Sequence, residues 1–435
     1  MSYKLPYLKK NIRKLSFLIY GLGSTGSSTI NYFKKKNFSN YSAWDDNLRI
    51  RKKFSSKITK NLKKELMSVD YIVLSPGISL NKVKFKKDLE KFKKKIITDI
   101  DLFYMENNAL KTIVVTGSNG KSTTCKMIAH LLKKNKVNVK LGGNIGTPVL
   151  SLKVKRNIFF VIEASSFQLS YSKFIHPNYA MLLNISNDHV EWHGSMAKYK
   201  NSKFKIFSLQ QNKNFALIHK DLKKTFKRKK YLSKVIPIKS DDYEKIKFKI
   251  KNDYLKSSAN DENMSFVFTL AKLFKIKNKS FIRIMSSFTG LPHRYETFLR
   301  KKNITFINDS KATSFQAAKK SLLSRKNIYW IVGGLPKYKD KFDLNHLSRN
   351  IVKAYIIGKN INFFKNQLKK KVKVSVTRNL KNTIISILKD IKLFKKNENT
   401  ILLSPCAASF DQFKNFENRG NDFKKLSRLY AKKFI

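Results

Sequence analysis

Short apolar runs alternate with helix-like stretches along most of this chain, and glycine or polar turns separate them. The apolar runs cover residues 16–20, 71–74, 112–115, 159–162, 179–183, 329–332, 354–357 and 400–403. Between two of these runs, the stretch 121–133 has an apolar side at helical spacing, formed by Met127, Ile128, Leu131 and Leu132. Apolar strands that alternate with helices are typical of parallel sheets covered on both faces, so the sequence predicts an α/β fold.

Three glycine turns indicate how many α/β units the chain contains. The chain has 435 residues, which allows two to four domains at roughly 100–200 residues each. Glycine turns near residues 21, 117 and 333 each follow an apolar run, which fits three α/β units. We expect ligand sites at these turns, because open α/β sheets bind ligands at the carboxyl ends of their strands.

Composition excludes several other classes of protein. Hydrophobic residues make up 42% of the chain, too many for a mainly disordered protein. The two cysteines, Cys125 and Cys406, are too few for a disulfide scaffold or a four-cysteine zinc site. No apolar run approaches the ~18 residues of a membrane span, and the N-terminus lacks an apolar segment of signal-peptide length. We expect a soluble, cytoplasmic protein with reduced thiols.

The net charge of +64 has two interpretations. It results from 92 Lys and Arg against 28 Asp and Glu. Basic patches bind nucleic acids by releasing phosphate counterions, which would make this a nucleic-acid-binding protein. Alternatively the charge reflects compositional drift, because AT-rich codons favour Lys, Asn, Ile and Phe, and only 15 residues are glycine. The lysines are scattered through every segment and no RNA-recognition or zinc-finger motif is present, so we favour drift.

The first glycine turn has the pattern G-x-G-x-x-G. Its glycines, Gly21, Gly23 and Gly26, directly follow an apolar run. Glycines at this spacing let backbone N–H groups approach a diphosphate at a helix N-terminus. Asp45 lies 19 residues beyond Gly26, where a ribose-binding acid is expected. Taken alone, the motif is typical of an NAD-dependent dehydrogenase, or of a glycine turn that binds nothing.

The second glycine turn, residues 116–123 (TGSNGKST), indicates a nucleotide site. Backbone amides of such a loop cradle phosphates, while Lys121 would neutralise the β/γ oxygens and Ser122 would bind Mg²⁺. Position 115 is Val, so the segment departs from the strict pattern G-x-x-x-x-G-K-[ST]. Its place between a strand and a helix still predicts phosphate binding by Gly117, Ser118, Asn119, Gly120, Lys121, Ser122 and Thr123.

Two further residues are candidates for holding a metal ion. Glu163 ends an apolar run, where a carboxylate beside a phosphate loop can bind Mg²⁺. His189 lies in the segment 187–192 (NDHVEW) and is a candidate ligand, as is His193 close behind it. The structural alternatives are a cap or an ion-pair partner for the glutamate and a packing role for the histidines.

Polar loops in the last third of the chain could bind an anionic small molecule or simply turn the chain. They are residues 290–296 (GLPHRYE), 308–314 (NDSKATS), 333–337 (GGLPK) and 404–420 (SPCAASFDQFKNFENRG). Cys406 has the chemistry of a nucleophile, but no base is evident near it in the sequence. We therefore interpret Cys406 as a buried thiol.

Taken in order along nearly the whole chain, these segments resemble the motifs of the Mur ligase family. NDSKATS and SPCAASFDQFKNFENRG are similar to the member that adds D-glutamate, and the DNPR-type signature of the diamino-acid-adding members is absent. The resemblance implies three α/β domains. These are a Rossmann-like domain for the UDP substrate (1–99), a central P-loop ATPase-like domain with a parallel sheet (100–290) and a Rossmann-like domain for the amino acid (291–435). The turn at Gly21 would then hold a UDP-sugar rather than NAD.

The reaction that the resemblance implies is an ATP-dependent ligation in peptidoglycan precursor synthesis. The carboxylate of UDP-N-acetylmuramoyl-L-alanine would attack the γ-phosphate of ATP and form an acyl phosphate. The amine of D-glutamate would attack that carbonyl, and a tetrahedral intermediate would collapse to the amide and phosphate. Catalysis of this kind depends mostly on positioning and charge neutralisation.

The resemblance also implies two Mg²⁺ ions, and a lysine carbamylated by CO₂ that binds one of them. The implied metal ligands are Ser122 and Glu163 on the ATP side, and His189 with the carbamylated lysine for the second ion. Lys203 best matches that lysine, and the alternatives are Lys200 and Lys205. The implied catalytic residues are Lys121, Glu163, His189 and Lys203.

The remaining ligand contacts come from the resemblance as well. The base and phosphates of ATP would meet Asn263, Arg294 and Asp309. The UDP part would contact Ser24, Thr25, Asp45, Gly77 and Asn144. D-Glutamate would lie against Lys311, Thr313, Lys337, Ser409 and Phe416, with Lys339 as the alternative to Lys337.

Two alternative functions share some of these features. A sibling ligase for another amino acid, or a folylpolyglutamate-synthase-like enzyme, would share the fold, but segments 308–314 and 404–420 argue against both. A basic nucleic-acid-binding ATPase would need a clustered basic stripe and aromatic platforms. We expect small-molecule substrates, no specific nucleic-acid partner, no membrane insertion and a monomer.

Overall fold

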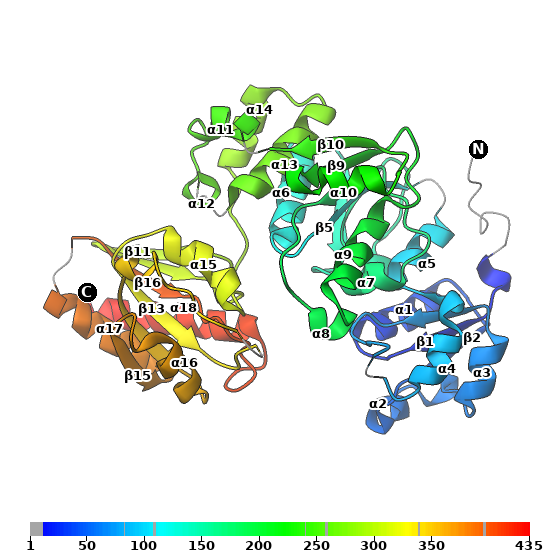
Figure 1. Cartoon of the computed structure of the whole chain (residues 1–435), viewed down its shortest axis with the longest axis horizontal. Coiled ribbons are helices and arrows are strands. Elements are labelled where there is room, and N and C mark those ends of the chain that lie inside the picture. Colours follow the sequence, from blue (N-terminus) through cyan, green and yellow to red (C-terminus); the bar gives the residue numbers. More distant parts are fainter. Residues whose placement is uncertain are drawn as a thin grey trace. The chain divides into compact units, whose positions relative to one another are not determined.

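The computed structural model describes residues 12–81, 83–107, 110–239, 241–256, 260–337, 340–394 and 397–435. They form three sheets, each with its own helices (Figure 1). The chain divides into two compact units: Met1–Lys245 with Glu262–Met285, and Ile246–Asp261 with Ser286–Ile435. Within the described ranges, no helix is both long and apolar enough to cross a membrane.

The first sheet is parallel and has the strand order β2-β1-β3-β4. Its strands are β1 (Phe17–Tyr20), β2 (Tyr41–Trp44), β3 (Tyr71–Leu74) and β4 (Ile96–Ile97). The helices that connect or follow them are α1 (Ser24–Lys35), α2 (Leu48–Lys52), α3 (Leu62–Ser68), α4 (Lys86–Lys91) and α5 (Asp99–Glu106). Alternate residues of β1 belong to two different cores, one on each face, which is why this strand reads as a continuous apolar run.

The second sheet is also parallel, in the order β10-β9-β8-β5-β7-β6. Its strands are β5 (Lys111–Thr116), β6 (Val139–Gly143), β7 (Phe159–Glu163), β8 (Tyr179–Leu182), β9 (Phe215–His219) and β10 (Lys234–Ile238). The helices here are α6 (Lys121–Lys134), α7 (Ser166–Tyr171), α8 (Val190–His193), α9 (Met196–Phe204), α10 (Lys223–Arg228), α13 (Asp261–Leu273) and α14 (Asn278–Ser286). The helix α11 (Asp241–Lys247) crosses the division between the two units, and α12 (Asp253–Lys256) belongs to the second unit.

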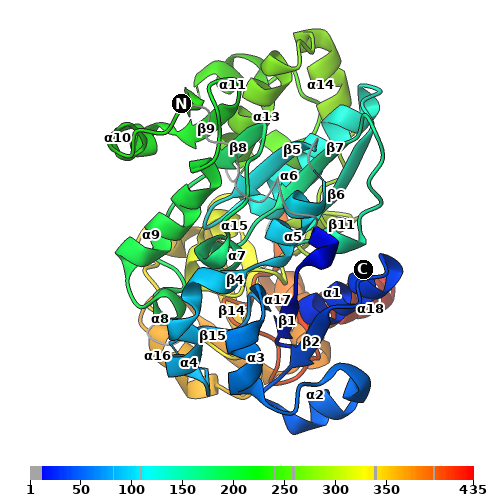
Figure 2. The same ribbon diagram turned by 90° about the vertical axis from the view of Figure 1, so that its right-hand side faces the viewer.

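Helix α5 joins the first two sheets into one unit. Seven of its eight residues are buried, so it has almost no solvent face. Its side chains share one hydrophobic core with residues of both sheets, and the rings of Phe103 and Phe160 lie 5.3 Å apart. In Figure 2, α5 lies between the strands of the first sheet and those of the second. The domain boundaries predicted at 99/100 and 290/291 stay predictions.

The third sheet has the order β11-β12-β16-β13-β14-β15, and it is parallel except for the antiparallel edge pair β11–β12. Its strands are β11 (Glu296–Lys301), β12 (Ile304–Asn308), β13 (Ile328–Gly333), β14 (Ile351–Ile357), β15 (Val374–Arg378) and β16 (Asn399–Leu403). Residues of helices α15 (Phe315–Leu323) and α16 (Ile361–Leu368) share a core with one face. Those of α17 (Leu380–Phe394) and α18 (Phe416–Phe434) share a core with the other.

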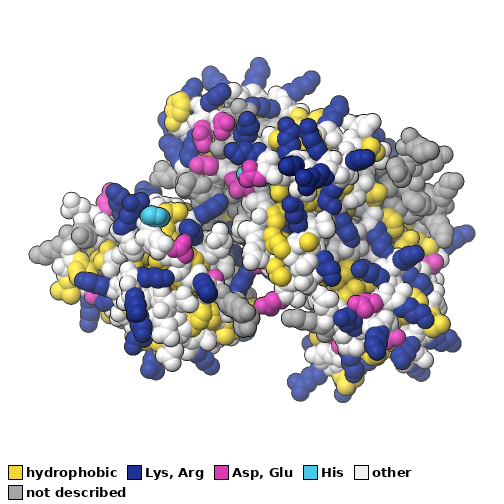
Figure 3. All heavy atoms as spheres, viewed as in Figure 1, with side chains coloured by type: hydrophobic (Ala, Val, Ile, Leu, Met, Phe, Trp, Pro, Cys, Tyr) yellow, Lys and Arg dark blue, Asp and Glu magenta, His cyan; other side chains and the backbone are white. Residues whose placement is uncertain are grey.

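The predicted α/β class is confirmed, and each of the three predicted glycine turns follows a strand of a different sheet: β1, β5 and β13. The helix predicted over residues 121–133 is α6. Lysine and arginine side chains are spread over the face of the molecule in Figure 3 and are interleaved with other residue types. This distribution fits the interpretation of the net charge as compositional drift.

Candidate active site

The predicted phosphate loop joins β5 to α6 in the central sheet. Gly120 is the N-cap of α6 and has a φ of +82°, a conformation that side-chain-bearing residues rarely adopt. A Cβ at Gly120 would lie 2.1 Å from Oδ1 of Asn263, so the loop and Asn263 can meet only if position 120 is glycine. Position 115, where the strict motif has glycine, is a residue of β5 that pairs with Glu163. The departure from the motif therefore lies in the strand and leaves the loop intact.

Two lysine side chains converge on this loop. The Nζ atom of Lys121 donates hydrogen bonds to the carbonyl oxygens of Gly117 (2.9 Å) and Ser118 (3.0 Å). The Nζ atom of Lys203 donates to the same Gly117 oxygen at 2.8 Å. The two lysine nitrogens place hydrogen-bond donors where phosphate oxygens would lie, and Lys121 would supply the positive charge that neutralises them.

Lys203 is the lysine of its segment that the fold places at the loop. It is only 1% exposed, and burial, followed by the charge of Lys121, holds its pKa well below the usual value for lysine. By contrast, Nζ of Lys205 donates to the carbonyl of Ser170, and Lys200 is half-buried. Lys203 is thus the residue in which a neutral amine is most favoured beside the phosphate loop.

Glu163, at the end of β7, fits the chemistry of a Mg²⁺ ligand. Its Oε1 atom accepts a hydrogen bond from Nδ2 of Asn144 at 3.0 Å. Its Oε2 atom is buried and has no hydrogen-bond partner among the described residues, and the same holds for Oγ1 of Thr116 at the end of β5. Buried polar atoms without partners are costly unless a ligand satisfies them, and oxygen atoms are the ligands that Mg²⁺ prefers.

His189 lies at the start of α8, with a φ of +53°. Its Nε2 atom is 3.3 Å from Oδ2 of Asp188, and its ring packs against Phe167 at 4.7 Å. In the part of the chain that the structure describes, no group of three or more His, Cys, Asp or Glu side chains is suited to hold a metal.

Sequence reasoning assigned no role to Asn184 and Tyr199, which shape the phosphate loop. Oδ1 of Asn184 accepts from Asn119 N at 2.9 Å, and its backbone carbonyl accepts from Ser118 N at 3.0 Å. The hydroxyls of Tyr199 and Ser118 lie 2.7 Å apart, and the Tyr199 ring packs under Nζ of Lys203 at 4.7 Å. Asn184 follows β8 closely, a position at the carboxyl edge of the sheet that could have revealed it.

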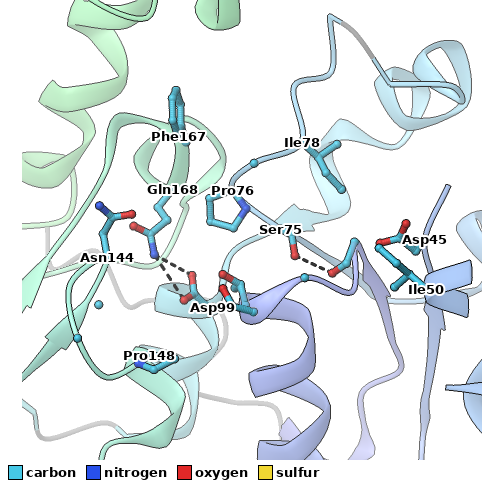
Figure 4. Close-up of a pocket in the computed structure, with 17 residues that line it drawn as sticks. Asp45, Ile50, Ser75, Pro76, Ile78, Asp99, Asn144, Pro148, Phe167 and Gln168 are labelled. Atoms are coloured by element: carbon cyan, nitrogen blue, oxygen red, sulfur yellow. Dashed lines mark hydrogen bonds between the residues drawn. The ribbon is translucent and has the colours of Figure 1, made fainter. Parts of the chain in front are cut away.

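A cavity of about 650 Å³ opens at the first glycine turn, inside the first unit (Figure 4). All five residues predicted to contact the UDP part line it: Ser24, Thr25, Asp45, Gly77 and Asn144. Asp45 also fixes the turn itself, because its two oxygens accept from the backbone N–H groups of Leu22 and Asn47, each at 2.8 Å. The cavity is large enough for a nucleotide-sized ligand.

Asp99 and Gln168 form the wall of this cavity beside Asn144 (Figure 4). Nε2 of Gln168 donates to Oδ1 of Asp99 at 3.1 Å. Burial raises the pKa of Asp99 to about 6, with this hydrogen bond opposing the shift. Because Asn144 also contacts Glu163, one side chain connects the cavity wall to the end of β7.

The residues predicted at D-glutamate all belong to the second unit. They lie in the loops after β12, β13 and β16 and in the first turn of α18. Nζ of Lys311 lies 3.6 Å above the ring of Phe416. Ser409 is buried and Lys337 is exposed, while Lys339 lies outside the described residues. Cys406 is a buried free thiol whose pKa burial holds well above its usual value, which confirms the interpretation of this residue.

Arg294 and Asp309 belong to the second unit as well, and their contact with ATP stays a prediction. The carboxylate of Asp309 accepts hydrogen bonds from the hydroxyls of Ser321 (2.6 Å) and Ser404 (2.9 Å). Burial raises its pKa to about 6. This carboxylate therefore already holds α15 and the end of β16 together.

Three largely parallel sheets, a phosphate loop between a strand and a helix, and a carboxylate at the next strand end define a nucleotide-binding α/β protein. Comparison with known proteins shows to which family within this class the chain is similar. Residues 115–291 match the Mur ligase middle domain, and residues 15–97 match the N-terminal domain of the Mur ligase MurD-like type. Proteins named UDP-N-acetylmuramoylalanine–D-glutamate ligase are similar along the full length. The one from Rickettsia bellii is 34% identical over 95% of this chain and 97% of its own, and the one from Buchnera aphidicola is 35% identical over 98% and 99%.

The chain therefore belongs to the Mur ligase family. Solved structures agree on the fold. The MurF ligase of Thermotoga maritima in complex with ADP matches with a TM-score of 0.58 at 16% identity, over 97% of this chain and all of that one. UDP-N-acetylmuramate-alanine ligase MurC of the same organism matches with a TM-score of 0.55 at 14% identity, over 96% of this chain and all of that one.

Proposed function

We infer that this chain is an ATP-dependent ligase that joins D-glutamate to UDP-N-acetylmuramoylalanine in peptidoglycan precursor synthesis. The observation that carries the inference is its full-length similarity, at 34% identity over 95% of the chain, to ligases named for this reaction. The intact phosphate loop and the unsatisfied Glu163 oxygen support it. We expect the enzyme to act as a monomer in the cytoplasm, on small molecules.

The phosphate loop is proposed to bind the triphosphate of ATP. Its backbone N–H groups and the start of α6 favour anionic oxygens, and Lys121 lies within reach of the same space. Ser122 and Glu163 are proposed to hold one Mg²⁺ on the ATP side and His189 a second one, and the two ions would supply positive charge against the phosphate oxygens. Asn263, packed against Gly120, is proposed to contact the nucleotide.

Lys203 is proposed to be carbamylated by CO₂. Carbamylation needs a neutral amine, and burial favours that state for Lys203. The modification would turn the buried amine 2.8 Å from the Gly117 carbonyl into an anionic oxygen ligand for the second metal ion. This group and His189 would be the residues that hold that ion.

The cavity at the first glycine turn is proposed to hold the uridine diphosphate, through Ser24, Thr25, Asp45, Gly77 and Asn144. The substrate carboxylate would accept the γ-phosphoryl group of ATP. The amine of D-glutamate, held by Lys311, Thr313, Lys337, Ser409 and Phe416, would displace phosphate from that acyl phosphate. The protein's part is to align the three reactants and to neutralise their charges.

Phosphate release from ATP tests this function. Wild-type protein with Mg²⁺ is expected to release phosphate only when both UDP-N-acetylmuramoyl-L-alanine and D-glutamate are present. Lys121→Ala is expected to lower the rate at least a hundredfold, because charge neutralisation at transferring phosphoryl groups is worth this much or more. Release that needs L-lysine or meso-diaminopimelate instead would keep the chemistry but assign another amino acid.

A further inference from the structure

One arginine is buried in the second unit, and its guanidinium contacts the protein mainly through backbone oxygens. Arg419, in the first turns of α18, is 1% exposed. Its Nη2 atom donates to the carbonyl oxygens of Ser310 (2.8 Å) and Ala407 (3.0 Å). Its Nε atom donates to Oγ of Ser310 at 3.0 Å. None of these acceptors carries a formal charge.

These contacts connect three loops at the carboxyl edge of the third sheet. Ser310 follows β12 and Ala407 follows β16. Gly334 follows β13 and has a φ of +130°, and a Cβ there would lie 3.2 Å from Nη1 of Arg419. Oγ of Ser310 in turn donates to the carbonyl of Phe416 at 2.9 Å, which ties α18 to the same point. The guanidinium is therefore enclosed by the loops that carry the residues expected at D-glutamate.

The positive charge of Arg419 is not compensated by a hydrogen-bonded carboxylate. Its Nη1 atom is buried and has no hydrogen-bond partner within the described ranges. The negative charge of Asp411 raises the pKa of Arg419 through space. An oxygen of the Asp411 carboxylate accepts a hydrogen bond from the Lys359 N–H at 3.0 Å. Burial lowers the pKa of Arg419 only to about 10, so the side chain is still a cation at neutral pH. A buried cation of this kind is costly unless a negative charge approaches it.

We propose that Arg419 is a positioning residue for the amino-acid substrate: it fixes the three loops, and its buried charge favours a substrate with two carboxylates. This rests on the proposed function. Lys311 and Thr313 follow Ser310, Ser409 follows Ala407, and Phe416 accepts the Ser310 hydrogen bond. Arg419 itself makes no contact with substrate in this scheme. Its field acts through the loops that enclose it, where partial burial leaves charge interactions less screened than in water.

The test compares Arg419→Gln with Arg419→Lys in steady-state kinetics. Arg419→Gln keeps a hydrogen-bonding side chain but removes the charge, and its KM for D-glutamate is expected to rise at least tenfold. Arg419→Lys restores the charge but loses the planar guanidinium, and its KM is expected to stay within about threefold of wild type. The KM values for ATP and for UDP-N-acetylmuramoyl-L-alanine are expected to change less than twofold in both variants.

Phe423→Leu is the matched control, because Phe423 is fully buried in the same helix and packs against Phe298 at 5.4 Å, in the core of the sheet. It is expected to lower the thermal midpoint with no change in KM for D-glutamate. Should Arg419→Gln not fold, Ser310→Ala removes the Nε acceptor and is expected to raise the same KM severalfold.

Two results would overturn the inference: equal KM values for D-glutamate in Arg419→Gln and Arg419→Lys, or an equal rise in the KM for ATP. Each would mean that Arg419 supports the fold without a role for its charge. A wild-type enzyme that does not use D-glutamate would instead refute the proposed function, so the two failures are distinguishable.

Discussion

At the scale of single residues, Gly120 has a left-handed backbone conformation and lies in the loop that is proposed to bind the nucleotide. Its φ of +82° and the 2.1 Å approach of a Cβ to Asn263 both exclude a side chain. Gly120→Ala is expected to destabilise the protein by ~1–3 kcal/mol and to weaken ATP binding at least tenfold. Gly23→Ala is the control, since a Cβ at Gly23 would meet nothing within 4 Å. Calorimetric ATP binding and thermal midpoints measure both, and wild-type affinity in Gly120→Ala would contradict this account of the loop.

Asp99 gives a prediction about pH. Burial raises its pKa from 3.8 to about 6, so the folded state favours the protonated form. Its contribution to stability is fully present below pH 3.8 and is lost as the pH rises to 6, a change of ~3 kcal/mol at 1.36 kcal/mol per pKa unit. Asp99→Asn removes this dependence. The difference in free energy of unfolding between the variant and wild type is expected to favour the variant more at pH 7.5 than at pH 4.5. An equal difference at the two pH values would contradict the role of Asp99.

The identity of the candidate residues could be predicted from the sequence more fully than the contacts that these residues make. All five residues predicted for the UDP part line one cavity, because each lies at a strand end or glycine turn of one unit. The choice among the three lysines could not be made from spacing, since Lys203 is distinguished only by its burial beside the phosphate loop. The support that Asn184 and Tyr199 give to the loop depends on tertiary contacts that no motif records.

At the scale of elements, Asp101 holds α5 to the segment after α7. Its two oxygens accept hydrogen bonds from the backbone N–H groups of Thr98, Lys173 and Phe174 and from the Ser172 hydroxyl, at 2.6 to 2.9 Å. Asp101→Ala leaves these donors without a partner and is expected to cost ~3 kcal/mol or more. The exposed Glu90→Ala is expected to change stability by less than ~0.5 kcal/mol. Denaturant unfolding of the two variants measures the difference, and equal effects would contradict the role of Asp101.

Comparison of the predicted with the observed strands shows which strands can be predicted from the sequence. All eight predicted strands are interior strands of their sheets, where both faces are covered and the apolar run is continuous. The six edge strands were all missed: β2, β4, β6, β10, β11 and β15. The edge strand β15, for example, is only partly buried, and its apolar pattern is interrupted by Ser375, Thr377 and Arg378. Of the interior strands, β9 and β12 were also missed.

At the scale of the whole molecule, the +64 charge is predicted to attract polyanions without serving the reaction. Duplex DNA is expected to bind at about 50 mM salt and to dissociate at about 200 mM, because such binding depends on counterion release. Phosphate release in the presence of both substrates is expected to be unchanged by DNA at the higher salt. Stimulation of ATP hydrolysis by DNA alone would instead favour a nucleic-acid-dependent ATPase.

We infer that the phosphate loop and the loops of the third sheet serve one ligase that adds D-glutamate. The most direct measurement offers the enzyme ATP, Mg²⁺, UDP-N-acetylmuramoyl-L-alanine and an equimolar mixture of isotope-labelled D-glutamate, unlabelled L-glutamate, L-lysine and meso-diaminopimelate. The product is then analysed by mass spectrometry. We predict a single product that carries one labelled glutamyl residue. A product that carries unlabelled glutamate, lysine or diaminopimelate, or no amide product at all, would contradict the claim.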